Sequence, residues 1–376
     1  MNILFLNSIE KGTYGGMEEW TRLVARSLVE RGHRVTVAGR TGSEYIRRAV
    51  SEHPRIRQLE LDISGDFNPV TITTLKQYMA RNDVDVVVVN FNKDIRLGGL
   101  AARWEHRPSV VWSVGLDITK DNPVHRFLTP RLIDGVMVPS QSLKNQITKF
   151  GYVDPAIVEV IPNATDDRDY VAPGEEARVQ LRERYGLPES ATIAVNVGRY
   201  VNQKGHTFLI EAAKRILKRF DEIVFLLVGD GPLRSSLESQ IAQVRLEDHF
   251  VLTGMVDRVD GILAGADLMV HSAVEEPFGF ALIEGMRAAL PIVAPAVGGI
   301  PEVVVDGETG LLVEPRNPQA LAEAVVTLLG DRARMQALGQ AGFQRWEAQF
   351  RLGKMVDRVE SYLGRFVKQG VRHGLG

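Results

Sequence analysis

The chain has 376 residues, of which 44% are hydrophobic and 24% are charged. These fractions are ordinary for folded proteins and exclude collagen-like, low-complexity and largely disordered chains. The chain has no cysteine, which excludes disulfides, thiolate zinc sites and a cysteine nucleophile. A formal net charge of −2 argues against a nucleic-acid partner.

The beginning of the chain predicts a buried strand. Residues 3–6 are apolar, but the run is too short for a signal peptide and no basic residue precedes it. No run of about 18 uncharged apolar residues follows, so we expect no membrane-spanning helix. We therefore predict a cytoplasmic protein. Weak peripheral contact with the inner membrane face is a minority interpretation of the basic and aromatic residues at 103–107 and 365–373.

Short apolar runs alternate along the chain with helical patterns. The first series of runs is 2–6, 35–39, 84–89, 110–112 and 135–138, and the second is 193–197, 223–228, 250–253, 267–270 and 292–294. Continuous apolar strands suit a parallel sheet buried on both faces, and amphipathic patterns such as 17–31 supply the covering helices. The alternation predicts an α/β protein with doubly wound, Rossmann-like sheets.

The two series are separated by a polar, proline-bearing stretch near 162–190, which is typical of an interdomain linker. At about 150 residues per domain, the length suggests two domains or one large barrel. We place an N-terminal domain at 1–165 and a C-terminal domain at 166–353.

Gly15 and Gly16 follow the first strand and precede a helix. Glycine there allows a ligand to approach the backbone, and a helix start offers free N–H groups to an anion. The spacing does not match the dinucleotide fingerprint GxGxxG, and a plain turn is about equally plausible.

Arg199 and Lys204 lie in a loop that follows the strand predicted at 193–197. Open α/β sheets place ligands at the carboxyl ends of their strands. Two cations at this edge can hold a diphosphate and offset the charge that builds on it as it leaves. The alternative is a solvated loop with two ordinary surface charges.

The stretch 275–302 is the most informative part of the chain. Glu276 comes before a helix start, and Glu284 lies in the second turn of that helix. Helix-start N–H groups bind phosphate, whereas carboxylates accept hydrogen bonds from sugar and ribose hydroxyl groups. A lone glutamate on a helix is usually solvent-exposed, but the combination favours a site for a phosphorylated, hydroxyl-rich ligand.

The eight histidines show neither HxxxH nor HExxH spacing. We therefore predict no metal site and no resident cofactor.

These residues together resemble a known family, the retaining GT-B glycosyltransferases of family 4, or glycosyl transferases group 1. Glu276 and Glu284 match its E-x7-E motif, and Arg199 and Lys204 match its paired basic residues in VGRYVNQKGH. The segments VGDGPLR, EPFGFALIEGM, GGIPEVV and DGETGLLVEP are also similar to that family's, and VIPNATDD resembles its PNGxD segment with Ala164 in place of glycine.

The resemblance implies a GT-B fold, in which two Rossmann-like domains face each other across a cleft that holds a nucleotide sugar as co-substrate. A C-terminal segment, about 354–376, would return to the N-terminal, acceptor-side domain, leaving 166–353 as the donor-binding domain. The family needs no catalytic metal.

The resemblance also assigns roles. Glu276 would hydrogen-bond the donor sugar, and Glu284 the ribose. Arg199 and Lys204 would stabilise the departing nucleoside diphosphate. Backbone N–H groups around three residues, Phe278, Gly279 and Phe280, would contact sugar or phosphate, and Gly15 and Gly16 would close over the phosphates.

One departure from the family concerns the acceptor side. Many members carry a histidine after the strand that matches residues 110–112, whereas this chain reads Ser113-Val114-Gly115-Leu116-Asp117. Asp117 and Lys93 are the alternatives we consider on that side.

We predict transfer of a sugar, with retention, from a nucleotide diphosphate sugar to a saccharide or lipid-linked glycan, in cell-envelope polysaccharide synthesis. A UDP-sugar is the donor that we expect first, and a GDP-sugar is the next candidate. The competing hypotheses are a nucleotide-sugar epimerase of related fold and a non-catalytic nucleotide-sugar binding protein. The oligomeric state has no signal in the sequence.

Overall fold

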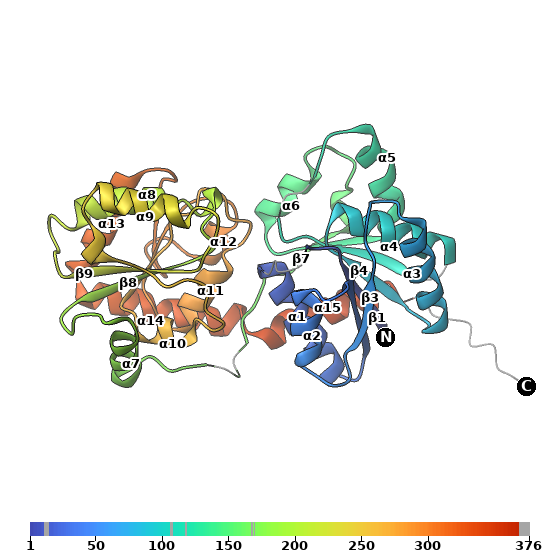
Figure 1. The fold of residues 1–376 in the computed structure, drawn as a ribbon, viewed down its shortest axis with the longest axis horizontal. Coiled ribbons are helices and arrows are strands. Elements are labelled where there is room, and N and C mark those ends of the chain that lie inside the picture. Colours follow the sequence, from blue (N-terminus) through green and yellow to red (C-terminus); the bar gives the residue numbers. More distant parts are fainter. Residues whose placement is uncertain (11–14, 106–107, 117–118, 167, 169, 368–376) are drawn as a thin grey trace, which may run out of the picture. The chain divides into compact units, whose positions relative to one another are not determined.

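A computed structural model describes residues 1–376 apart from 11–14, 106–107, 117–118, 167, 169 and 368–376. The chain forms two compact units (Figure 1). The first unit consists of 1–163 and 352–376, and the second of 164–351. The roles of the two units, acceptor side and donor side, stay predictions.

The first unit is a parallel sheet covered by helices on both faces. Its strands are β1 (Asn2–Asn7), β2 (Arg34–Arg40), β3 (Arg57–Leu61), β4 (Val86–Val89), β5 (Ser109–Ser113), β6 (Gly135–Val138) and β7 (Val158–Val160). Their order in the sheet is β3-β2-β1-β4-β5-β6-β7, and all neighbours are parallel. The order reverses between β1 and β4, which is the arrangement of a doubly wound fold.

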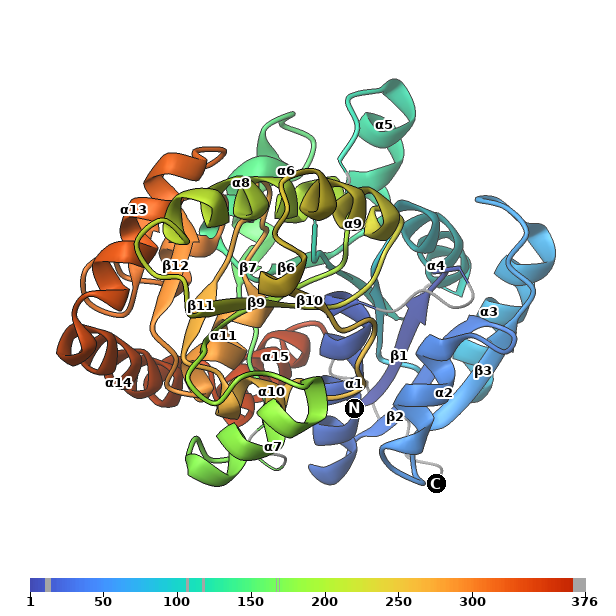
Figure 2. The same cartoon turned by 60° about the vertical axis from the view of Figure 1, so that its left-hand side comes forward.

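Seven helices of the described residues cover this sheet. They are α1 (Gly16–Glu30), α2 (Glu44–Ser51), α3 (Pro69–Arg81), α4 (Asn92–Glu105), α5 (Pro123–Leu132), α6 (Gln141–Thr148) and α15 (Leu352–Gly364). Helices α1, α2 and α15 lie on one face, and α3 to α6 lie on the other (Figures 1 and 2).

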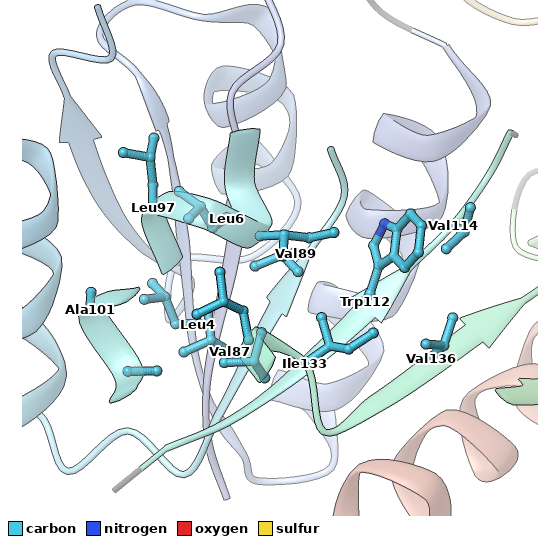
Figure 3. Packing of buried hydrophobic residues seen from close by; sticks show 14 of the residues in the cluster. Leu4, Leu6, Val87, Val89, Leu97, Ala101, Trp112, Val114, Ile133 and Val136 are labelled. Carbon is cyan, nitrogen blue, oxygen red and sulfur yellow. The ribbon is translucent and has the colours of Figure 1, made fainter. Parts of the chain in front are cut away.

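Alternation along the strands builds the core of the first unit. Leu4 and Leu6 of β1 join one buried cluster with Val87, Val89 and Trp112 of the neighbouring strands (Figure 3). The alternate residues of β1 point to the opposite face of the sheet. They are buried as well, because helices also cover that face. The sequence pattern is therefore continuous rather than alternating.

The second unit repeats this architecture. Its strands are β8 (Thr192–Val197), β9 (Ile223–Val228), β10 (Phe250–Leu252), β11 (Leu268–Val270), β12 (Ile292–Pro295) and β13 (Leu311–Val313). They are parallel, in the order β10-β9-β8-β11-β12-β13. The order reverses between β8 and β11.

Eight α-helices of the described residues belong to the second unit. They are α7 (Glu175–Tyr185), α8 (His206–Ile216), α9 (Arg234–Gln243), α10 (Asp260–Gly265), α11 (Phe280–Arg287), α12 (Ile300–Val303), α13 (Pro318–Leu329) and α14 (Arg332–Gln349). Helices α8, α9 and α13 lie on one face of the sheet, and α10, α11 and α14 on the other (Figures 1 and 2). Strand β9 contributes to the core on each face of the sheet, because its alternate residues belong to two different buried clusters.

One stretch that the sequence indicates as a linker is different in the structure. Residues 162–190, read as a linker, contain helix α7. Only Ala177 and Leu181 of this helix are buried, so its sequence looks as polar as a linker. The helix packs on α10, where a Cβ added to Gly265 would lie 2.4 Å from the carbonyl oxygen of Ala177.

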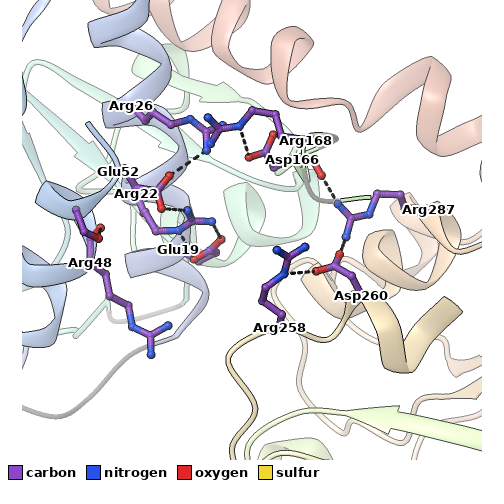
Figure 4. Close-up of polar contacts among 11 residues, drawn as sticks. Glu19, Arg22, Arg26, Arg48, Glu52, Asp166, Arg168, Arg258, Asp260 and Arg287 are labelled. Atoms are coloured by element: carbon purple, nitrogen blue, oxygen red, sulfur yellow. Dashed lines mark hydrogen bonds and ion pairs between the residues drawn. The ribbon is translucent and has the colours of Figure 1, made fainter. Parts of the chain in front are cut away.

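The chain leaves the second unit along two adjacent segments. Thr165 donates its N–H to the carbonyl of Phe350 (3.1 Å), and its hydroxyl accepts from the indole of Trp346 (2.7 Å). Arg287 donates to the carbonyl of Asp166 and pairs with the carboxylate of Asp260 (Figure 4). These contacts fix both segments on the second unit.

Helix α15 belongs to the first unit, although it follows the second in sequence. The hydroxyl of Tyr362 donates to the carbonyl of Ile157 (2.6 Å) and accepts the N–H of Val136 (3.0 Å). The side chain of Glu360 bonds to Arg31 (2.6 Å) and His33 (2.7 Å). One buried hydroxyl therefore ties α15 to the backbone at β6 and just before β7.

This hydroxyl generates a prediction about stability. Tyr362→Phe leaves the buried amide of Val136 without its partner, which costs about 1–3 kcal/mol. We expect a lower urea midpoint and faster amide hydrogen exchange at Val136. Tyr170→Phe is the matched control, since Tyr170 is 39% exposed. Equal midpoints for the two variants would show that the hydroxyl does not hold α15.

Candidate functional site

Two loops meet at the carboxyl edge of the second sheet. Strands β8 and β11 are neighbours there, at the point where the strand order reverses. The loop after β8 runs from Gly198 to Gly205, and the loop after β11 runs from His271 to Gly279. Ligands of open α/β sheets bind at such a reversal point.

Glycine allows these two loops to touch. Gly205 has a φ of +60°, and a Cβ there would lie 2.1 Å from the carbonyl oxygen of Ser272. Ser272 also donates its hydroxyl to the carbonyl of Lys204 (2.9 Å). The N–H groups of Val274 (2.8 Å) and Glu275 (3.3 Å) donate to the carbonyl of Gln203. The backbone of the first loop is thus bonded to the second along its length.

This bonding brings Lys204 and Glu276 together. The Nζ of Lys204 lies 2.5 Å from Oε2 of Glu276, and Nε2 of His271 lies 3.3 Å from the same oxygen. Glu276 is only 8% exposed. Both protein contacts use Oε2, and among the described residues no hydrogen bond reaches Oε1.

The charges around Glu276 keep it ionised. Burial raises the pKa of its carboxyl, but the ammonium of Lys204 and the hydrogen bond from His271 outweigh burial and lower the pKa to about 2. Burial lowers the pKa of His271 despite its acidic neighbour, and the charge of Lys204 adds to this. At neutral pH the site therefore holds a carboxylate, an ammonium and a neutral imidazole.

The start of α11 adds an anion-binding element. Gly279, the residue before α11, has a φ of +111°. The first two N–H groups of the helix, those of Phe280 and Ala281, have no acceptor within it, whereas those of Leu282 and Ile283 donate to the carbonyl of Gly279. Phe278 is buried and packs edge-on against Phe350, with ring centroids 6.0 Å apart. This buried ring fixes the helix start on the core.

The loop after β12 supports Glu276 from another side. Gly299 donates its N–H to the carbonyl of Glu276 (2.9 Å). Gly298 has a φ of +57°, and a Cβ there would lie 2.0 Å from the same carbonyl oxygen. The glycine pair therefore holds the backbone at Glu276, in keeping with its place at a strand's carboxyl end.

Arg199 lies on the same edge with its side chain exposed. It makes no ion pair with any residue that the structure describes. Its backbone is fixed from behind, because a Cβ on Gly229 would lie 2.2 Å from the carbonyl oxygen of Gly198. A fixed loop that carries an exposed guanidinium suits phosphate binding.

Glu284 is half-buried on α11, one helical turn before Arg287. It lines a shallow surface depression, together with Tyr170, Val171, Asp260, Leu263, Arg287 and Ala288. The structure does not test its predicted role on the ribose.

The site residues that the sequence predicts in the first unit lie in different parts of that unit. Gly15 precedes α1 and Gly16 begins it, and neither has the positive φ that requires glycine. A Cβ on Gly16 would meet no atom of the described residues within 4 Å. Lys93 lies in the first turn of α4, 3.9 Å from the carboxylate of Asp66. Asp117 lies outside the described residues.

Sequence reasoning missed the role of His271. The spacing of the histidines indicates no metal site, and the sequence analysis assigns no role to any histidine. The signal was its position, since His271 follows β11 directly and precedes Glu276 by five residues.

Among the described residues, no three histidine or acidic side chains are grouped to hold a metal ion. No helix of the described chain is long and apolar enough to cross a membrane.

The edge of the second sheet therefore combines two cations, one ionised carboxylate and free helix-start N–H groups. Cations and N–H groups bind phosphate, and a carboxylate accepts hydrogen bonds from hydroxyl groups. The arrangement fits a ligand that has both.

Family models match both units of the chain. Residues 14–169 match Glycosyltransferase Family 4, and residues 178–345 match Glycosyl transferases group 1. The second match contains Arg199, Lys204, Glu276 and Glu284.

Curated relatives agree with the models. The N-acetyl-alpha-D-glucosaminyl L-malate synthase of Bacillus anthracis is 30% identical over 54% of this chain and 52% of its own length. A GDP-mannose-dependent alpha-(1-6)-phosphatidylinositol monomannoside mannosyltransferase of Mycobacterium tuberculosis is 28% identical over 93% of this chain and 94% of its own. The chain thus spans about half of the first relative and nearly all of the second.

Solved structures show the same fold. Anabaena HepE in complex with UDP and glucose has a TM-score of 0.85 and 22% identity, over 97% of this chain and 99% of its own. A glycosyltransferase of Rickettsia africae has a TM-score of 0.86 and 21% identity, over 98% and 99%. Two parallel α/β units, the predicted motifs at one sheet edge and these matches together show that the chain belongs to the GT-B glycosyltransferases of family 4.

Proposed function

We propose that the chain transfers a glycosyl group, with retention, from a nucleotide diphosphate sugar to a saccharide or lipid-linked glycan. The observation that carries this proposal is the contact of 2.5 Å between Lys204 and Glu276, beside the start of α11 and the exposed Arg199. A nucleotide sugar presents a diphosphate and sugar hydroxyl groups next to each other, which matches this set of groups.

The residues divide the chemistry as follows. Arg199 and Lys204 neutralise the diphosphate as the bond from the sugar C1 to the phosphate oxygen breaks and the electron pair goes to that oxygen. Glu276 accepts hydrogen bonds from the sugar hydroxyls, and Glu284 from the ribose. Helix-start N–H groups at Phe280 bind the phosphates or the sugar.

Retention follows in the proposal from attack on the face that the diphosphate leaves. The acceptor oxygen bonds to C1 on that face, and its proton passes to the departing phosphate oxygen. Atoms and charge balance without a protein nucleophile. The absence of cysteine from the chain is consistent with this, and metal independence stays a prediction.

The relatives guide the proposal for the acceptor and the site of action. The Bacillus anthracis and mycobacterial relatives are named for malate and phosphatidylinositol monomannoside. The mycobacterial name supports a lipid-linked acceptor, whereas malate is neither a saccharide nor a lipid; a role in making envelope glycans is part of the proposal. Trp104 is 58% exposed, with Nζ of Lys76 4.4 Å from its ring centroid. This pair is where weak peripheral membrane contact would be tested.

The first prediction concerns Glu276. Glu276→Gln keeps the shape of the side chain but removes its charge, so transfer should fall about a hundredfold or more. Initial rates of nucleoside diphosphate release with acceptor present measure this. Glu275→Gln is the matched control, because Glu275 is the exposed neighbour. Equal rates for the two variants would contradict the proposal.

The second prediction concerns the cations. Arg199→Ala should weaken nucleoside diphosphate binding about tenfold or more and flatten the dependence of binding on salt, since it removes a phosphate contact. Calorimetric titration measures both effects. Arg215→Ala removes an exposed arginine of the same unit and should change neither. An unchanged affinity in the Arg199 variant would remove that residue from the site.

The third prediction concerns the donor. A ligand that binds only the folded state raises the melting temperature, so the true donor should give the largest shift. We would test UDP-sugars first and GDP-sugars second. The name of the mycobacterial relative motivates the test of GDP-sugars. The product formed from the donor distinguishes the two competing hypotheses. An epimer of the donor indicates an epimerase, and binding without any turnover indicates a binding protein. Either result would overturn the proposed transfer.

A further inference from the structure

We infer that His271 is a positioning residue that holds the carboxylate of Glu276 when Lys204 turns from that carboxylate to the donor diphosphate. This inference rests on the proposed function and adds a residue for which the sequence showed no role. Its basis is the geometry behind Glu276.

Oε2 of Glu276 has two donors of different kinds. Lys204 reaches it from the loop after β8, on a flexible side chain that is 25% exposed. His271 reaches it from the end of β11 and is only 2% exposed. One donor is charged and lies on a long, partly exposed side chain, and the other is buried and neutral.

His271 is fixed at both of its ends. Its backbone N–H donates to the carbonyl of Val293 in β12 (2.8 Å), and the bond from Nε2 fixes the ring. Glu276 needs a donor, so the ring carries its proton on Nε2. Nδ1 is buried and has no hydrogen-bond partner among the described residues. Only the contact with Glu276 therefore gives the imidazole a polar role here.

The proposed reaction requires Lys204 to serve two partners. In the structure its ammonium lies against Glu276. A bound diphosphate carries more negative charge than one carboxylate and attracts the ammonium more strongly. As Lys204 turns, Glu276 would lose its ionic partner inside the protein, and an unpaired buried charge is costly.

His271 prevents that loss from moving the carboxylate. Its N–H keeps Oε2 in place, so that Oε1 stays directed to the sugar. A neutral donor is suited to this task, because it does not compete with the diphosphate for Lys204. His206, which is also buried, is kept neutral as well: burial, with the charge of Lys204 added to it, lowers its pKa to about 4.

Two isosteric substitutions test this role. The amide nitrogen of glutamine can occupy the position of Nε2, whereas the shorter asparagine places its amide near Nδ1. His271→Gln should retain transfer within about threefold of the unchanged chain. His271→Asn should lower kcat about tenfold to about a hundredfold, the cost of one hydrogen bond to a charged group.

The two variants should also separate binding from turnover. Lys204 and Arg199 remain, so calorimetric affinity for the nucleoside diphosphate alone should stay within about threefold in both. A purely structural role would instead lower the melting temperature of both variants without this order in kcat. Equal kcat values for the asparagine variant and the unchanged chain, or equal losses in both variants, would overturn the inference. Absence of transfer by the unchanged chain would overturn the proposed function instead.

Discussion

The contact between Lys204 and Glu276 is the interaction on which the site depends. It joins two loops from neighbouring strands, at the one place in the second sheet where the strand order reverses. Burying a carboxylate is favourable only when partners compensate it, and here an ammonium and an imidazole do so. The loops meet because Gly205 leaves room for the carbonyl of Ser272, 2.1 Å from where its Cβ atom would be, and Gly298 lets the loop after β12 approach the carbonyl of Glu276 in the same way. Phosphate-binding and hydroxyl-binding groups are thereby held next to each other.

The sequence predicts the fold well, since both sheets are parallel and helices cover both of their faces. Continuous apolar runs such as residues 223–228 show directly that both faces are covered. The sequence does not indicate the short strands β3 and β13, because most side chains of β3 are exposed and those of β13 are only partly buried, so both resemble loop sequence. Helix α7 was read as linker for a similar reason: two buried residues in a polar helix give little periodic signal.

The site was only partly predictable. Lys204 and Glu276 could be placed at one edge from strand positions, and the structure brings them into contact. His271 escaped, because its role depends on the ring's direction in three dimensions and not on spacing. The same holds for Gln203 and Ser272, which act through a backbone carbonyl and a hydroxyl. Strand position suggested phosphate binding for Arg199, and family resemblance supplied the role of Glu284 on the ribose; the structure tests neither role.

A double-mutant cycle on Lys204 and Glu276 tests the account most directly. The variants Lys204→Met, Glu276→Gln and their combination are unfolded in urea, with and without saturating nucleoside diphosphate. The account predicts a favourable coupling free energy between the two residues without ligand, and a clearly smaller one with it, because the diphosphate takes over the ammonium. An equal coupling in both conditions would mean that Lys204 never leaves Glu276, and would contradict the assignment of this pair to the donor.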